Sequence, residues 1–137
     1  MAARVQFARD FLVTPPRKVR VVAVPGKGRG VVATEPIAKG ELIEICPVID
    51  LSDKEKKWVD TESDVLSGHA LYKPEDGGQV LMLGYGSLYN HSRQPNAELD
   101  YDPAGVKFVA LVDIAVDEEI VYDYDFDNGV EEFLDLA

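Results

Sequence analysis

The chain has 137 residues, of which 46% are hydrophobic, and a formal net charge of −11. This composition predicts one globular domain with its own core, and the negative charge argues against direct nucleic-acid binding, in which basic residues neutralise phosphates. The single cysteine, Cys46, excludes an internal disulfide and a multi-cysteine zinc site, and the apolar runs are far shorter than the roughly 20 residues of a membrane span.

The first 18 residues are expected to form an irregular or edge segment, because Pro15 and Pro16 interrupt regular structure. They lack the continuous apolar core and the cleavage site of a signal peptide. Cys46 lies in an apolar run, where we expect a buried, inert thiol and therefore a reducing environment. These features predict an intracellular protein, cytoplasmic or, if it is eukaryotic or acts in a host cell, nuclear.

The next part of the chain predicts short strands separated by turns. Residues 19–24 are rich in β-branched side chains and predict a strand, and residues 31–34 predict a second one. Residues 25–30 between them predict a glycine-rich turn. Residues 42–51 are apolar and β-branched, and Pro47 either bends this strand or divides it in two.

A polar region follows, in which Asp53 is expected to cap a short helical turn. Residues 61–79 predict a loop with a short strand around residues 69–72. Residues 79–83 predict a brief apolar strand, which leads into the stretch LGYGSLYNHSRQPN at residues 83–96. This stretch is too polar for a plain strand and too aromatic for an ordinary solvated loop. Its polar groups need partners once they are buried, so we expect it to hold a ligand or another piece of chain.

Taken alone, the pair Asn90-His91 allows several interpretations. His91 could be a general base, half of a metal site, or a partly buried histidine that holds the loop. The only other histidine, His69, has no metal-ligand spacing to it, so we predict no metal site. No nucleophile motif accompanies the histidine either.

The last part predicts a hairpin and a final strand. Residues 97–101 and 106–111 flank the turn Asp102-Pro103-Ala104-Gly105. Residues 120–124 alternate as a last strand, and residues 131–136 predict a terminal helical turn. The many short strands and frequent turns predict a mainly β fold built from small sheets.

Acidic residues gather at this end of the chain. From residue 113 onward there is no Lys or Arg, and there are ten acidic residues: Asp113, Asp117, Glu118, Glu119, Asp123, Asp125, Asp127, Glu131, Glu132 and Asp135. Such a field favours a cationic partner, for instance a Lys- or Arg-rich peptide. The alternative is that these residues only keep a small protein soluble.

Three motifs that follow one another along the chain provide further information on the family. GRGVVATEPIAKGELI, LGYGSLYNHSRQPNA and DEEIVYDYD together resemble the SET-domain family of protein lysine methyltransferases, in a minimal single-domain form similar to viral and bacterial members. The resemblance implies a β-clip fold of several small sheets, in which the C-terminal strand makes a knot-like crossing. It also implies an N-terminal segment at residues 1–18, the SET domain at residues 19–126 and an acidic C-terminal tail at residues 127–137.

The resemblance further implies the cofactor S-adenosylmethionine, with S-adenosylhomocysteine as product. Carried over by motif, the residues that bind this cofactor are Gly28, Arg29, Gly30, Asn90, His91 and Tyr124. Tyr124 is also the implied catalytic residue. The implied contacts to the substrate are Tyr72, Tyr85, Tyr122 and Phe126. Many family members close the lysine channel with a cysteine-rich zinc segment, which is missing here, so we expect Phe126 or Phe133 to take its place.

The expected reaction is methyl transfer to a lysine of a basic protein or histone-like tail. Tyr122 favours monomethylation, because its hydroxyl can hold a water that obstructs a bulkier amine. The alternative is an inactive module of the same fold that binds a basic peptide through its acidic face. Neither nucleic acid nor membrane is an expected partner, and a homodimer is left open.

Overall fold

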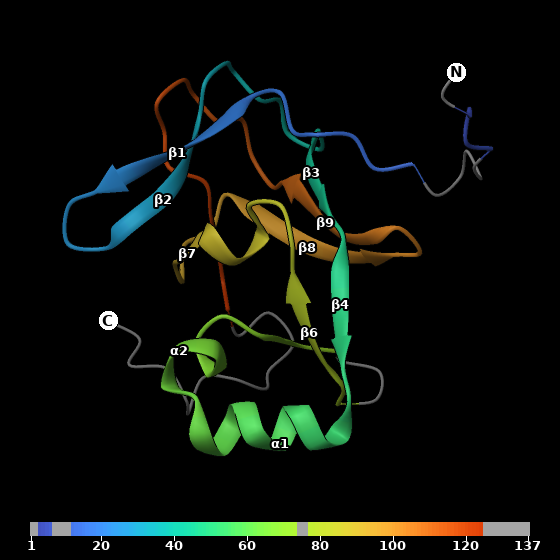
Figure 1. Cartoon of the computed structure of the whole chain (residues 1–137). Helices are drawn as coiled ribbons and strands as arrows, with labels where there is room; N and C mark the ends of the chain where they lie inside the picture. Colours follow the sequence, from blue (N-terminus) through green and yellow to red (C-terminus); the bar gives the residue numbers. More distant parts are fainter. Residues whose placement is uncertain (1–2, 7–11, 74–76, 125–137) are drawn as a thin grey trace.

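The computed structural model describes residues 3–6, 12–73 and 77–124 (Figure 1). The predicted helical turn at residues 131–136 and the residues Asp125, Phe126 and Phe133 lie outside this part. The elements of the described part are β1 (Val19–Val24), β2 (Gly28–Ala33), β3 (Leu42–Cys46), β4 (Val48–Leu51), α1 (Asp53–Glu62), α2 (Asp64–Ser67), β5 (Leu71–Tyr72), β6 (Gln79–Met82), the 3-10 helix η2 (Gly86–Leu88), β7 (Asn90–His91), β8 (Ala97–Asp102), β9 (Gly105–Ala110) and β10 (Val121–Tyr122).

The strands form small sheets, as the sequence predicts. The β1–β2 hairpin lies at one end of the molecule and α1 at the other (Figure 1). Between them lie two three-stranded sheets, with strand orders β3-β9-β8 and β4-β6-β5. A fourth, parallel pair joins β10 to β7. Pro47 separates β3 from β4, so the apolar run 42–51 forms two strands that belong to different sheets.

The predicted glycine-rich turn at residues 25–30 is too long. Strand β2 begins at Gly28, which pairs with Val24, so only three residues connect the two strands. Gly28 has a φ of +81°, a conformation that glycine adopts without a steric penalty. The hairpin can therefore start its ladder at a residue that local sequence rules assign to the turn.

The polar insert is more helical than predicted. Ser52, not Asp53, is the N-cap of α1: its hydroxyl accepts from the amide of Glu55, and the Glu55 carboxylate accepts from the amide of Ser52. This reciprocal capping box satisfies two amides that the first helical turn leaves free. The Ser63 hydroxyl caps α2 by accepting from the amide of Leu66, within the predicted loop. No helix of the described residues is long and apolar enough to span a membrane.

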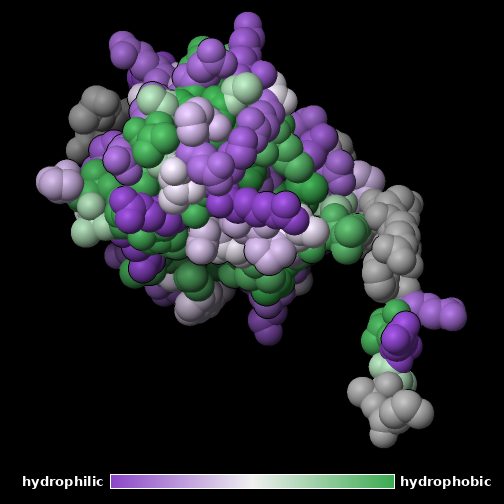
Figure 2. Space-filling model, turned by 90° about the horizontal axis from the view of Figure 1, so that it is seen from above, coloured by the Kyte–Doolittle hydropathy of each residue, from purple (hydrophilic) through white to green (hydrophobic). Residues whose placement is uncertain are grey.

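Aromatic side chains form the centre of the core. Tyr89 stacks on Phe108 with ring centroids 4.1 Å apart, and Tyr122 meets Phe108 edge-on at 5.3 Å. All three are buried. On the face that Figure 2 shows, hydrophobic and hydrophilic residues are interspersed. Exposed apolar residues scattered in this manner are ordinary for a protein surface.

The C-terminal segment crosses between two other parts of the chain. On one side, Ala33 donates its amide to the Glu118 carbonyl and Ile120 donates to the Val31 carbonyl. On the other side, β10 pairs with β7, and Ser92 and Asn96 donate amides to residues of β10. The predicted knot-like crossing is therefore present. The regular strand is shorter than the predicted residues 120–124 and covers only Val121–Tyr122.

Candidate active site

One cavity lies where β2, the end of α2, η2 and β7 meet. Its volume is about 430 Å³, within the range of small-molecule sites. Its walls are formed by Lys27, Gly28, Arg29, Gly68, His69, Ser87, Leu88, Asn90 and Tyr124. Four of the six residues with an implied cofactor role thus line one space, although they come from three distant stretches of the sequence.

The glycines of β2 have two different roles. At Gly28 an added side-chain carbon would meet no atom within 4 Å, so the backbone is open at this position. At Gly30 the same carbon would lie 2.5 Å from Glu119 Oε2 and 2.8 Å from Asn90 Nδ2. Gly30 does not line the cavity. It allows the Glu119 carboxylate and the Asn90 amide to approach the strand closely.

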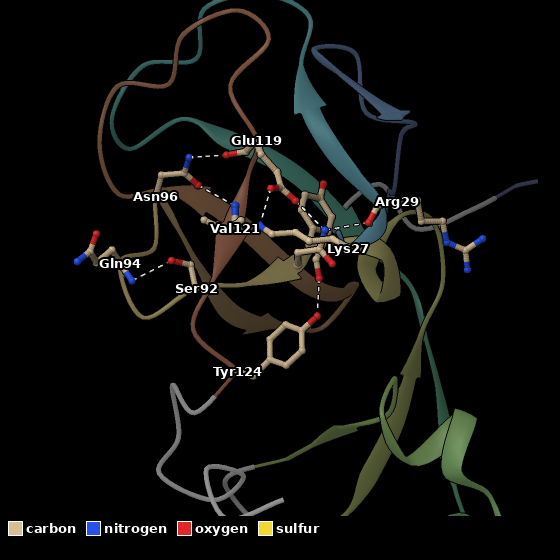
Figure 3. Close-up of polar contacts among 10 residues, drawn as sticks. Lys27, Arg29, Ser92, Gln94, Asn96, Glu119, Val121 and Tyr124 are labelled. Atoms are coloured by element: carbon tan, nitrogen blue, oxygen red, sulfur yellow. Dashed lines mark hydrogen bonds and ion pairs between the residues drawn. The ribbon is translucent and has the colours of Figure 1, made fainter. Parts of the chain in front are cut away.

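Asn90 is held by two acceptors. Its Nδ2 donates to the Arg29 carbonyl at 2.8 Å and to Glu119 Oε2 at 2.7 Å. Glu119 Oε1 also pairs with Lys27 Nζ at 2.8 Å (Figure 3). Because both Nδ2 hydrogens have acceptors, the Asn90 Oδ1 atom is the group left to face a ligand, and it can only accept. The Arg29 side chain points away from the other labelled residues, so Arg29 contributes its backbone here.

His91 connects the loop to the C-terminal segment. Its Nδ1 accepts from the Tyr124 amide at 3.0 Å, and its ring lies 5.1 Å from the Tyr124 ring. An accepting Nδ1 places the proton of a neutral imidazole on Nε2. The contact agrees with the interpretation of His91 as a residue that holds the loop, and His91 is absent from the residues that line the cavity.

Tyr124 lies at the wall of the cavity with its hydroxyl fixed. The hydroxyl donates to the Tyr89 carbonyl at 2.7 Å (Figure 3). Burial, and secondly the negative charge of Glu119, raise the pKa of Tyr124 to about 12. The phenol therefore stays protonated at physiological pH. Tyr122 lies beside it, with the ring centroids 4.8 Å apart, and burial raises its pKa well above the usual value.

The other implied substrate contacts are more spread out. Tyr85 precedes η2 as its N-cap, and its amide donates to Glu44 Oε2 at 2.9 Å. The Tyr72 hydroxyl donates to Asp60 on α1 at 2.8 Å, so this hydroxyl turns toward the helix. Neither tyrosine lines the cavity described above. Phe126 lies outside the described residues.

Sequence reasoning missed several residues of the site. Lys27 adjoins the first motif and Leu88 lies within the second, but nothing in their own spacing marks them. The sequence suggests no role for His69 beyond that of a metal ligand; in the structure it lies in the cavity wall, with its Nδ1 2.7 Å from the Val65 carbonyl. The sequence marks Glu119 only as one of the acidic residues near the C-terminal end, yet its carboxylate joins Lys27 to Asn90. Its position two residues before β10 was the one available signal.

Comparisons with known proteins agree with the fold. The sequence profile of the SET domain matches residues 28–125. A Schizosaccharomyces pombe protein named histone-lysine N-methyltransferase, H3 lysine-37 specific, is 38% identical over 100 residues, which are 72% of this chain and 67% of that protein.

Two solved structures are similar as well. A candidate histone methyltransferase of Plasmodium falciparum is 31% identical, with a TM-score of 0.61 over 79% of this chain and 93% of the other. The Neurospora SET domain protein DIM-5, a histone lysine methyltransferase, is 18% identical and shares the fold, with a TM-score of 0.62 over 77% of this chain and 51% of that one. The matched motifs, the crossing of β10 with β7 and these similarities show that the chain belongs to the SET-domain family.

Proposed function

We propose that this protein is an S-adenosylmethionine-dependent protein lysine N-methyltransferase. The observation that carries the proposal is the convergence of Gly28, Asn90 and the Tyr124 ring on one cavity. The relatives named as histone-lysine methyltransferases support a lysine in a basic protein as the acceptor. The acidic end of the chain supports the same substrate class, because it attracts a basic peptide.

The residues of the cavity fit the proposed cofactor. S-adenosylmethionine supplies a methyl group on a positively charged sulfur, together with an amino-acid part and an adenosine. The Asn90 Oδ1 atom is an acceptor suited to an ammonium group, and Lys27 lines the cavity as a cation suited to a carboxylate. The open backbone at Gly28 leaves room for close approach, and the Tyr124 ring offers a face to a sulfonium.

The chain's own residues would promote the transfer by positioning and desolvation. A lysine must be neutral to attack, although its usual pKa is about 10.4. The buried ring of Tyr122 and the partly buried ring of Tyr124 provide apolar surroundings that lower this pKa, and the leaving proton passes to solvent. The Tyr124 hydroxyl, which donates to the Tyr89 carbonyl, retains lone pairs that can accept weak C–H contacts from a polarised methyl group.

We further propose that the product is monomethyllysine. Tyr122 is 6% exposed and packs between Phe108 and Tyr124, so its ring has little freedom to move. Its hydroxyl can hold a water in the channel, which leaves less room for an amine that already carries a methyl group.

The test is the transfer of a labelled methyl group from the cofactor to an array of basic peptides, with calorimetry of S-adenosylhomocysteine binding. We expect Tyr124→Phe to lower kcat by about tenfold to a hundredfold through loss of positioning. Trp58→Phe is the control, because Trp58 is an exposed aromatic residue on α1 and does not line the cavity. A wild-type protein that binds neither cofactor nor product contradicts the enzyme proposal; binding of basic peptides without transfer would favour the inactive module.

A further inference from the structure

A carboxylate lies inside the core behind the active site. Glu44 on β3 is only 3% exposed. Its Oε1 accepts the Tyr89 hydroxyl at 2.7 Å, and its Oε2 accepts the Tyr85 amide at 2.9 Å. The thiol of Cys46 is a further partner: burial, and secondly the charge of Glu44 and a hydrogen bond to it, raise the pKa of this thiol.

The backbone of the central loop is shaped around this carboxylate. Gly84 has a φ of +61°, and a side-chain carbon at this position would collide with Glu44 Oε2. Any larger residue at position 84 would push the carboxylate away. The loop at residues 83–89 therefore meets Glu44 at three successive places: the space at Gly84, the amide of Tyr85 and the hydroxyl of Tyr89.

Stability alone does not account for a carboxylate at this position. Burial of such a group is unfavourable unless hydrogen bonds compensate it, and apolar side chains often fill such sites equally well. The neighbouring residue Ile43 is an apolar residue buried in the same core. A carboxylate accepts hydrogen bonds and thereby fixes the positions of the groups that donate to it. An apolar side chain cannot do this.

Tyr89 connects Glu44 to Tyr124 in the candidate active site. Its hydroxyl is bound by Glu44, its ring stacks on Phe108 at 4.1 Å, and its carbonyl accepts the Tyr124 hydroxyl at 2.7 Å. A movement of Tyr89 therefore moves the acceptor that orients the Tyr124 hydroxyl. The Asn90 side chain is held separately by Glu119 and the Arg29 carbonyl, so this movement need not alter the cofactor contacts.

We propose that Glu44 is a positioning residue, which holds Tyr89 in place and thereby fixes the hydroxyl of Tyr124. The predicted effect on the rate rests on the proposed methyltransferase function. The predicted effect on the Tyr124 hydroxyl is independent of that function and can be measured without turnover.

Two single variants test the proposal. Tyr89→Phe removes one hydroxyl and keeps the stacked ring and the carbonyl. Glu44→Gln keeps the shape but turns an NH2 group toward one of two donors. In both we expect the pKa of Tyr124, followed by NMR of 13Cζ-labelled tyrosine, to fall below about 12, because the displaced Tyr89 carbonyl binds the neutral phenol less well. Burial and the charge of Glu119, the main causes of the raised pKa, remain in both variants. We expect kcat to fall about tenfold to a hundredfold, with KM for the cofactor unchanged.

Two further variants separate positioning from stability. Ile37→Ala weakens buried packing in the bridge to Ile114, away from the cavity, and should leave the Tyr124 titration unchanged. The double variant Glu44→Leu with Tyr89→Phe removes both buried partners, so its melting temperature should recover relative to Glu44→Leu. Positioning predicts that kcat and the Tyr124 pKa do not recover with it.

Recovery of all three quantities in the double variant would overturn the proposal. An unchanged Tyr124 titration in both single variants would overturn it as well. A wild-type protein that transfers no methyl group contradicts the proposed function instead, and the Tyr124 titration then decides the role of Glu44 by itself.

Discussion

Tyr124 is held in place by contacts of its backbone amide, its hydroxyl and its ring. Its amide donates to His91, its hydroxyl donates to the Tyr89 carbonyl, and its ring lies beside that of Tyr122. All three contacts are made by other residues of the chain. A side chain that is held in place beforehand loses little conformational freedom when a substrate arrives, which favours efficient positioning.

Tyr122 is the residue at which the number of transferred methyl groups should be decided. We predict that Tyr122→Phe shifts the product from monomethyllysine toward dimethyl- and trimethyllysine, because removal of the hydroxyl frees the space of a bound water. The buried ring contacts with Phe108 and Tyr124 remain, so the fold should persist. Mass spectrometry of a peptide product over time measures the distribution. Ready trimethylation by the wild-type protein would refute the assigned role.

At the scale of the elements, Asn96 joins the loop to the C-terminal segment. Its Oδ1 accepts the Val121 amide at 2.9 Å, and its Nδ2 donates to Glu118 Oε2 and to the Glu119 carbonyl. Asn96 is 7% exposed, so these groups are largely shielded from water. One side chain thus supplements the two-residue pairing of β7 with β10, which would be weak alone.

We predict that Asn96→Ala destabilises the crossing by about 2 kcal/mol, because it leaves the Val121 amide without its side-chain acceptor. Urea denaturation should show the loss of stability, and hydrogen exchange at the Val121 amide should accelerate. Gln94→Ala is the matched control in the same loop, since Gln94 is exposed and its backbone amide makes the contact to Ser92. Equal effects of the two variants would contradict this role of Asn96.

At the scale of the whole molecule, the buried tyrosines make stability sensitive to high pH. Burial is the main cause that raises the pKa values of Tyr89, Tyr122 and Tyr124. Each folded-state pKa lies above the unfolded value of about 10, so the folded protein binds these protons more tightly. Their contribution to stability is complete below a pH of about 10 and is lost as the pH rises through the folded-state values.

We therefore predict that the free energy of unfolding falls as the pH rises above about 10. Tyr124, with a pKa raised to about 12, accounts for about 2–3 kcal/mol of this loss. Denaturation curves measured from neutral pH to about pH 12 should show a steeper decline for the wild type than for Tyr124→Phe, which lacks this titration. Parallel declines in the two proteins would contradict the prediction.

Much of the fold was predictable from local patterns. Strand β1 and the β8–β9 hairpin follow from β-branched runs and turn residues, which act over a few positions. Predictions from local sequence were wrong where a strand pairing or a helix cap determined the conformation instead. Gly28 joins a ladder instead of a turn, and Ser52 rather than Asp53 caps α1 because its hydroxyl and Glu55 bond reciprocally.

The sequence by itself determined the family, through three motifs whose order is specific, and it indicated Gly28, Asn90 and Tyr124 as residues to examine. Only the tertiary structure brought these residues to one cavity and joined Asn90 to Lys27 through Glu119. It also revealed the buried Glu44 behind Tyr89. The reason is physical: a motif reports what a short segment can do, whereas hydrogen-bond partners 29, 41 and 45 residues apart are set only when the chain folds.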